Sequence, residues 1–378
     1  MNQLIKQKCI MIIAGEASGD IHGSNLVRAM HEKNGAFFFC GIGGQALKHA
    51  GVRVLIDAEE LAVVGISEVF LKLPAIFRGL TAAKQILKGL RPDLLILIDY
   101  PDFNLRVAAT AKKLGIPVLY YISPQVWAWR SSRVNKIEKL INRMAVILPF
   151  EEEFYRKHNV PVTFVGHPLL DHNSAEHIIG NRKDLESDVI GLLPGSRDGE
   201  VGRHLPVMLE AAFIITGRIK KIKFIISVAP SVKRKQIEEI IKKHNGSADF
   251  ELVTESVAEV CSQCSFVIAA SGTVTLEVAI TGTPMIIIYK VSPLSYWLGK
   301  IMISVKNIGL VNLIAGREIV PELLQSKACP ENIADTAVAM LNDPPGLERL
   351  SNELHGIRDL LGGPGASERV ADIALSML

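Results

Sequence analysis

The sequence predicts an α/β protein of two doubly wound domains, each with a parallel sheet covered by helices on both faces. Three observations lead to this prediction. Apolar runs alternate with helix-like amphipathic segments along most of the chain. The runs are continuously apolar, as in 94–98, which is typical of parallel strands buried on both faces. Finally, 378 residues exceed one ordinary core, so two domains are expected.

In the first half, strands and helices alternate regularly, which predicts right-handed crossovers between parallel strands. The expected strands are 9–14, 36–40, 94–98, 117–121 and 143–148. The expected helices are 20–33, 74–90, 103–114, 130–141 and 150–158. The alternation pauses at 166–188, where Gly-His-Pro precedes a polar stretch that we interpret as a linker.

The second half repeats this scheme. The expected strands are 189–193, 222–228, 250–253, 265–270 and 284–289, and the expected helices are 204–218, 231–244, 256–263 and 273–281. Beyond Pro330 the pattern is helical, with a break at 343–346. We therefore place the domains at 1–170 and 171–346, and expect the C-terminal helix, 347–378, to pack back on the first.

Composition excludes several classes of protein. The net charge of +3, from 42 basic and 39 acidic residues, is too balanced for a nucleic-acid-binding protein. Five cysteines predict reduced thiols and a cytoplasmic location, and Cys261-Ser-Gln-Cys264 lacks the second ligand pair of a zinc site. No charge-free apolar run reaches ~20 residues, so no spanning helix is expected, and 9–14 is interpreted as a strand rather than a signal peptide.

Three apolar runs open through a glycine turn into a helix-like segment. They lead into Gly15-Glu16-Ala-Ser18-Gly19-Asp20, Pro194-Gly195-Ser196-Arg197 and Ser271-Gly272-Thr273. Such turns present backbone N–H groups and a positive helix end to anions. With two domains facing a common cleft, they predict a phosphorylated substrate and a second reactant. Helix capping is the alternative for the first and third turns.

Two further segments suggest chemistry at a carboxyl edge of the first sheet. Asp99 follows the fully apolar run 94–98, where partial burial would raise its pKa toward that of a general base; Asp102 is a second candidate or a helix cap. The segment 120–130 includes Trp127, whose ring could stack on a sugar, and Arg130, which could contact phosphate. A packed loop is the alternative. In the second half, Arg203 and His204 are expected to add cations near Arg197.

These motifs together resemble the lipid-A-disaccharide synthases. The resemblance extends over essentially the whole chain, in the order 15–20, 99–104, 123–130, 164–168, 192–197 and 271–277. It implies a GT-B glycosyltransferase that inverts the anomeric centre. It also implies transfer of 2,3-diacylglucosamine from its UDP derivative to 2,3-diacylglucosamine 1-phosphate, which gives the β-1′,6-linked disaccharide 1-phosphate of lipid A and UDP.

The resemblance also implies roles for residues. Asp99, Arg197 and Asn312 would be catalytic. UDP would be bound by Gly195, Ser196, Arg197, Ser271, Gly272, Thr273, Glu277 and Gln325. The sugars would meet Gly15, Glu16, Ser18, Gly19, Asp20, Trp127 and Arg130. No metal or cofactor is expected, because no Asp-x-Asp motif lies in a suitable loop and arginine with helix N-termini would stabilise the diphosphate.

Diacylated substrates imply a peripheral enzyme at the cytoplasmic face of a bacterial inner membrane. The segment 63–78 is apolar with nearby cations, as in an amphipathic helix at an anionic phospholipid surface. Its inserting residues would be Val64, Phe70, Leu71, Leu73, Ile76 and Phe77. Packing on its own domain is the alternative, and 294–305 is a second membrane candidate. A UDP-sugar 2-epimerase and a non-catalytic nucleotide-binding protein stay open as functions, as does the oligomeric state, including a homodimer.

Overall fold

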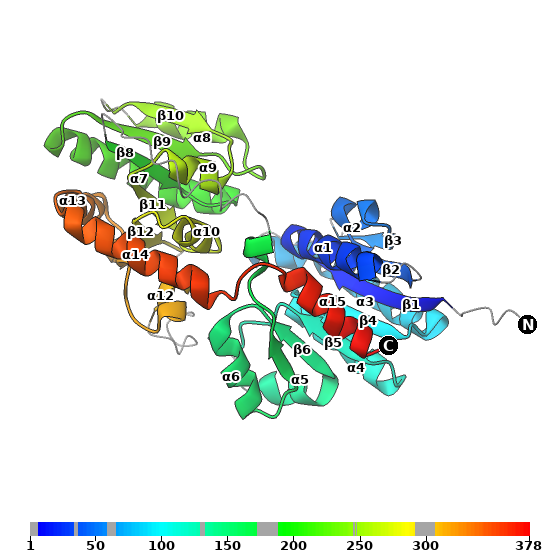
Figure 1. Cartoon of the computed structure of the whole chain (residues 1–378). Coiled ribbons are helices and arrows are strands. Elements are labelled where there is room, and N and C mark those ends of the chain that lie inside the picture. Colours follow the sequence, from blue (N-terminus) through cyan, green and yellow to red (C-terminus); the bar gives the residue numbers. More distant parts are fainter. Residues whose placement is uncertain are drawn as a thin grey trace, which may run out of the picture. The chain divides into compact units, whose positions relative to one another are not determined.

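The computed structural model describes residues 7–33, 37–58, 66–128, 133–171, 188–244, 246, 248–291 and 307–378 (Figure 1). The chain divides into two compact units. Unit 1 contains Met1–Asp171 and Leu361–Leu378, and unit 2 contains His172–Leu360. Each unit has its own parallel sheet and its own core.

Unit 1 has a seven-stranded sheet in the order β3-β2-β1-β4-β5-β6-β7. The strands are β1 (Lys8–Ala14), β2 (Phe37–Gly43), β3 (Arg53–Asp57), β4 (Leu94–Ile98), β5 (Val118–Tyr121), β6 (Arg143–Val146) and β7 (Val162–Phe164). All neighbours are parallel. β4 is buried along its whole length, because helices cover both faces of the sheet.

Alternate side chains of the unit 1 strands enter two separate cores. Met11 and Leu95 lie in the core on one face, and Ile12 and Ile96 lie in the core on the other. The helices are α1 (Ala17–Lys33), α2 (Gln45–His49), α3 (Ile66–Leu90), α4 (Pro101–Lys113), α5 (Val134–Leu140), α6 (Pro149–Lys157) and α15 (Ala366–Ser376), with a 3-10 turn, η3 (Pro168–Asp171). α15 packs beside α1, as Figure 1 shows.

Unit 2 has a six-stranded parallel sheet in the order β10-β9-β8-β11-β12-β13. The strands are β8 (Asp188–Leu193), β9 (Ile222–Ser227), β10 (Phe250–Val253), β11 (Phe266–Ala270), β12 (Met285–Tyr289) and β13 (Glu322–Leu324). The helices are α7 (Asp198–Arg218), α8 (Arg234–Lys243), α9 (Val257–Ser262), α10 (Val274–Ile280), α12 (Leu310–Ala315), α13 (Pro330–Leu341) and α14 (Pro344–Leu360), with a 3-10 turn, η5 (Gln325–Lys327). α7 and α13 pack together over the sheet core.

The α/β prediction is confirmed, and several details differ. β3, β7 and β13 were not predicted. β7 and β13 have three residues each, too few for a periodic pattern, and β3 is not a continuously apolar run, because it begins with Arg53 and ends with Asp57. α3 begins at Ile66 rather than 74, with Pro74 inside it. The segment 347–378 does not return as one piece. α14 belongs to unit 2, and α15 lies in unit 1.

Candidate active-site residues in the two units

Asp99 lies in a strained turn at the carboxyl end of β4. Asp99 and Tyr100 both adopt left-handed backbone angles, with φ of 44° and 48°. The Asp99 carbonyl accepts hydrogen bonds from the Tyr120 hydroxyl at 2.6 Å and the Asn104 amide at 2.7 Å. Its N–H donates to the Tyr121 carbonyl at 3.1 Å. These contacts hold the backbone in a conformation that non-glycine residues adopt at a cost, which is common at functional sites.

The surroundings of Asp99 raise its affinity for a proton. Burial raises the pKa of its carboxyl to about 6, the nearby Glu16 carboxylate adds to this rise, and the backbone N–H of Tyr100 opposes it. A carboxylate of this pKa can accept a proton near neutral pH. Asp102 differs, because its side chain is 71% exposed and pairs with Arg133 at 2.7 Å. The structure therefore singles out Asp99 as the candidate base.

The segment 15–20 combines exposed and structural residues beside Asp99. Glu16 and Ser18 are exposed, whereas Asp20 is buried. The Asp20 carboxylate accepts hydrogen bonds from the backbone N–H groups of Gly44 (2.6 Å), Ala46 (2.8 Å) and Leu47 (3.2 Å), so it joins the first turn of α1 to the start of α2.

The two glycines of this segment pack closely. A Cβ on Gly15 would lie 2.3 Å from the Tyr100 ring, and one on Gly19 would lie 3.5 Å from Ala14 and from Ile98. Gly15 therefore permits the aromatic ring to lie against the turn. The exposed polar side chains that remain for a substrate in this segment are Glu16 and Ser18.

The turn after β5 is fixed by Glu151, a residue that the sequence pattern does not single out. Glu151, in the first turn of α6, accepts hydrogen bonds from the Ser123 hydroxyl at 2.6 Å and the Trp127 indole N–H at 3.0 Å. A glutamate in the first turn of a helix is typical of ordinary N-terminal capping. The sequence around Glu151 therefore does not indicate that its side chain binds Ser123 and Trp127. Arg130 lies outside the described residues.

The expected membrane segment is described in part. Val64, and the side chains of Phe70, Leu71 and Leu73, lie outside the described residues, as does 294–305. Phe77 is 54% exposed. Ile76 is half-buried and packs on the core of unit 1, and its insertion into a membrane stays a prediction. In the described part of the chain, no helix has the length and apolar character to span a membrane.

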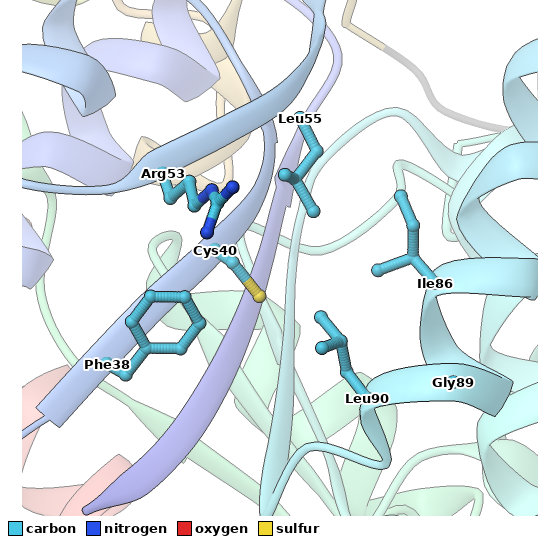
Figure 2. A pocket seen from close by; sticks show the side chains of 7 residues that line it. All are labelled: Phe38, Cys40, Arg53, Leu55, Ile86, Gly89 and Leu90. Carbon is cyan, nitrogen blue, oxygen red and sulfur yellow. The ribbon is translucent and has the colours of Figure 1, made fainter.

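A pocket of about 310 Å³ lies between the sheet of unit 1 and the end of α3 (Figure 2). It is mostly apolar and is lined by Phe38, Cys40, Arg53, Leu55, Ile86, Gly89 and Leu90. Arg53 begins β3 and Leu90 ends α3, so the pocket lies toward the amino edge of the parallel sheet. Asp99 follows β4 at the carboxyl edge, and none of the expected site residues lines the pocket.

In unit 2, the turn after β8 presents an anion-binding arrangement already occupied by a carboxylate. Gly195 has φ +119°, which favours glycine. Glu200 accepts hydrogen bonds from the Ser196 N–H at 3.3 Å and from the Arg197 guanidinium at 3.2 Å. The Arg197 side chain is 62% exposed, and such surface pairs contribute little stability. An incoming diphosphate can therefore replace Glu200 at Ser196 and Arg197.

His204 contacts this turn, but not as a cation. Its Nε2 accepts the Lys290 N–H at 3.1 Å, so Nδ1 carries the proton that is donated to the Pro194 carbonyl at 3.0 Å. Burial lowers the pKa of His204. The expectation that His204 adds positive charge is therefore wrong. The neutral ring joins the turn after β8 to the end of β12.

The turn after β11 places a carboxylate near a helix start. The Ser271 N–H donates to the Ile288 carbonyl at 2.9 Å, and the Thr275 hydroxyl donates to the Gly272 carbonyl at 2.8 Å. Burial raises the pKa of Glu277, on the first turn of α10. Among the described residues, the Glu277 carboxylate has no hydrogen-bond partner, so it can accept hydroxyl groups of a ligand.

Asn312 has a structural environment. It is 0% exposed. Its amide donates to the Val320 carbonyl and the Glu322 carboxylate, both at 2.8 Å. Its Oδ1 accepts the N–H groups of Ile319 (2.8 Å) and Val320 (3.0 Å). A side chain with four bonds and no exposed surface does not reach a substrate, which differs from the expected catalytic contact.

Gln325 follows β13 with φ +53°. In the amide orientation that satisfies both of its polar atoms, it donates to the Val291 carbonyl at 3.2 Å and accepts the Val291 N–H at 3.1 Å. The side chain is half-buried. Gln325 thus ties β13 to the segment after β12, and it retains some exposed surface.

Comparison of the sequence with known proteins identifies one family over most of the chain. Residues 10–356 match the family model described as lipid-A-disaccharide synthetase. Relatives include the lipid-A-disaccharide synthases of Syntrophus aciditrophicus, 47% identical over 99% of both chains, and Coxiella burnetii (strain CbuK_Q154), 38% identical over 99% of this chain and 100% of the relative.

Solved structures with the same fold are much less similar in sequence. A UDP co-structure of MnaA from S. aureus has a TM-score of 0.65 at 14% identity, covering 98% of both chains. MurG of Acinetobacter baumannii has a TM-score of 0.59 at 15% identity, covering 98% of this chain and 99% of that one. At such identities the likeness establishes the fold alone.

Proposed function

The chain belongs to the lipid-A-disaccharide synthetase family, and on that premise we propose how residues of its two units carry out one glycosyl transfer. The protein is a glycosyltransferase of lipid A disaccharide synthesis, with the GT-B fold, and it uses a UDP-sugar and a lipid A precursor. The epimerase alternative is not favoured, because relatives that are 47% and 38% identical over 99% of this chain are lipid-A-disaccharide synthases. The finer assignment is UDP-2,3-diacylglucosamine as donor and 2,3-diacylglucosamine 1-phosphate as acceptor.

Asp99 is the proposed general base, and the observation that carries the proposal is its place in the strained turn directly after β4, where burial and the nearby Glu16 carboxylate raise its pKa. Its carboxylate takes the proton of the acceptor 6-hydroxyl as that oxygen attacks C1 of the donor sugar. The bond from C1 to the β-phosphate oxygen breaks, and UDP leaves with the electron pair. Attack from the face opposite UDP inverts C1. Glu16, Ser18 and Trp127 are assigned to the sugars.

Unit 2 is assigned to UDP. The backbone at Gly195 and Ser196 and the Arg197 guanidinium bind the diphosphate in place of Glu200. Charge grows on the leaving oxygen as the C1–O bond breaks, so these donors stabilise the transition state more than the ground state. Ser271, Gly272 and Thr273 are assigned to the same ligand, Glu277 to the ribose hydroxyls and Gln325 to the nucleotide. Asn312 acts indirectly, by fixing the backbone at Ile319 and Val320.

Incubation with both lipid substrates tests this function directly. We expect one disaccharide 1-phosphate and one UDP per donor consumed, separated by thin-layer chromatography, and no product when the acceptor is omitted. An epimerase would instead convert the UDP-sugar alone. A nucleotide-binding protein without catalysis would leave both substrates unchanged, which would refute the proposal.

We propose that α3 contacts the membrane surface, and Phe77 provides the test. A large apolar side chain that leaves a bilayer costs ~1.5–3 kcal/mol. Phe77→Ser should therefore weaken binding to anionic vesicles at least about tenfold in co-sedimentation, while the triple Phe70→Ser, Leu71→Ser, Phe77→Ser variant should be released.

The control for this experiment replaces exposed apolar residues on other helices. Ile21 and Leu360 are each 47% exposed, and Ile21→Ser with Leu360→Ser should leave vesicle binding unchanged. Circular dichroism and UDP affinity report whether the variants fold. Vesicle binding by a folded triple variant would refute the assignment to α3, and unfolding of the triple variant would show that Phe70 and Leu71 belong to the core.

A further inference from the structure

A second buried carboxylate lies at the same sheet edge as Asp99. Glu151 is only 2% exposed. Its Oε1 accepts the Ser123 hydroxyl at 2.6 Å and the Trp127 indole N–H at 3.0 Å, and its Oε2 accepts the Leu148 N–H at 3.1 Å. Each of these partners is a donor, so the arrangement is complementary to an ionised carboxylate.

The turn that Glu151 holds begins with a strained residue. Ile122 has φ +62°, an outlier for a β-branched side chain. Its N–H donates to the Ala145 carbonyl at 3.1 Å, and the Pro124 carbonyl accepts the Tyr155 hydroxyl at 3.1 Å. Together with the Glu151 bond to Ser123, these contacts hold 122–124 to β6 and α6. Strained backbone of this kind persists only where its surroundings impose it.

The same contacts reach the turn that contains the candidate base. The Tyr120 hydroxyl donates to the Asp99 carbonyl at 2.6 Å. Burial raises the pKa of Tyr120, and the nearby Asp99 and Tyr155 add to that rise. Tyr120 therefore lies close to both. Tyr120 contacts the turn that contains Asp99, and Tyr155 contacts the turn 122–128, so these two neighbouring tyrosines connect the two turns.

We propose that Glu151 is a positioning residue for the transfer, whose ionised carboxylate holds Trp127 where the indole ring supports the acceptor sugar. This inference rests on the proposed function. The indole N–H is used by Glu151, so the ring offers its apolar surface, which suits the C–H face of a sugar. Phe150 supports the ring edge-to-face, with ring centroids 4.8 Å apart at 82°.

Glu151 is held at a cost to stability. Burial raises the pKa of its carboxyl to about 7 from an ordinary 4.5, against the hydrogen bonds from Ser123, Leu148 and Trp127. Tyr155 interacts with it and stays neutral, because burial raises the pKa of the Tyr155 hydroxyl. Between pH 4.5 and 7 the folded protein binds more protons at Glu151 than the unfolded chain does. The free energy of unfolding therefore falls as pH rises through that window, and the functional, ionised form is the less stable one.

Glu151→Gln tests the proposal, with Glu153→Gln as the matched control. Glutamine keeps one oxygen for Ser123 and Trp127, but its NH2 group faces the Leu148 N–H. At pH 8 we expect the acceptor KM to rise about tenfold, as for one lost charge-assisted bond, while kcat and UDP affinity stay within about threefold. Glu153 is on the same helix, 72% exposed and paired with Lys157, so its variant should match the parent protein.

Tryptophan fluorescence gives a readout that does not depend on activity. A Trp129→Phe, Trp297→Phe background leaves Trp127 as the single tryptophan of three. Its emission should titrate with a midpoint near pH 7 and should become flat when Glu151→Gln is added. The Tm of the parent protein should fall from pH 5 to 8 more steeply than that of Glu151→Gln.

The two readouts separate the possible outcomes. An unchanged acceptor KM in a folded Glu151→Gln protein would overturn the proposal, and so would a flat titration in the parent background. If Glu151→Gln does not fold, the fluorescence titration of Trp127 in the parent background still tests whether the ionisation of Glu151 affects Trp127. If the parent protein forms no disaccharide, the proposed function fails, and the fluorescence titration still tests whether Glu151 controls Trp127.

Discussion

Replacing Asp99 by asparagine is expected to lower kcat by at least ~10²-fold, the low end for loss of general-base catalysis. Asparagine preserves the shape of the side chain but cannot accept the proton of the acceptor hydroxyl at neutral pH. UDP affinity should be unchanged, because UDP is assigned to unit 2. Steady-state disaccharide formation and calorimetric titration with UDP measure the two quantities separately.

The pH dependence of kcat provides a second test of Asp99. The base must be ionised, and its pKa is about 6, so kcat of the parent enzyme should rise about tenfold per pH unit below 6 and level off above it. The kcat of Asp99→Asn should not show this rise with pH below 6. The pH dependence of stability is opposite to that of kcat. Because the pKa of Asp99 is raised from 3.8 to about 6, the free energy of unfolding falls as pH rises across that window.

Asp102→Asn is the matched control, because Asp102 is exposed and lies three residues after Asp99, in the first turn of α4. It loses a surface pair with Arg133 and should keep kcat within about twofold. Near-parental turnover of a folded Asp99→Asn protein would remove Asp99 from the mechanism.

Replacing Arg197 by alanine should weaken UDP binding and slow transfer together. A hydrogen bond to a charged group contributes about 1.5–3 kcal/mol, so UDP affinity should fall roughly 10- to 100-fold. The loss in kcat/KM should be larger still, because the guanidinium meets more charge as UDP departs. Calorimetry with UDP and initial rates at subsaturating donor measure these effects.

Two further variants make this experiment specific. Arg218 is at the far end of α7 and pairs with Asp335 on the surface, so Arg218→Ala should have no effect on UDP affinity. Glu200→Gln should tighten UDP binding, because Glu200 competes with the diphosphate for Ser196 and Arg197. Unchanged UDP affinity and turnover in Arg197→Ala would contradict the assignment of the diphosphate.

The sequence predicted the elements whose pattern is long and local. The fully apolar run 94–98 identified β4, and the carboxylate that follows it drew attention to Asp99, because a charge beside a buried strand is unusual. The glycine turns after β1, β8 and β11 were predicted because each one directly follows an apolar run and precedes a helix-like segment. Strands of three residues, such as β7 and β13, do not repeat often enough to be distinguished from loops.

The amino-acid pattern was therefore sufficient to predict the fold class, the strand ends at which chemistry is expected, and Asp99 and Arg197 as candidates. The charge and the role of the buried polar residues could be read only from the folded chain. His204 is neutral because Lys290, far along the chain, donates to it. Asn312 is enclosed by the backbone of 319–320, and Glu151 is held by a turn from another strand. Burial and hydrogen-bond partners set charge and role, and both depend on contacts between segments distant in sequence.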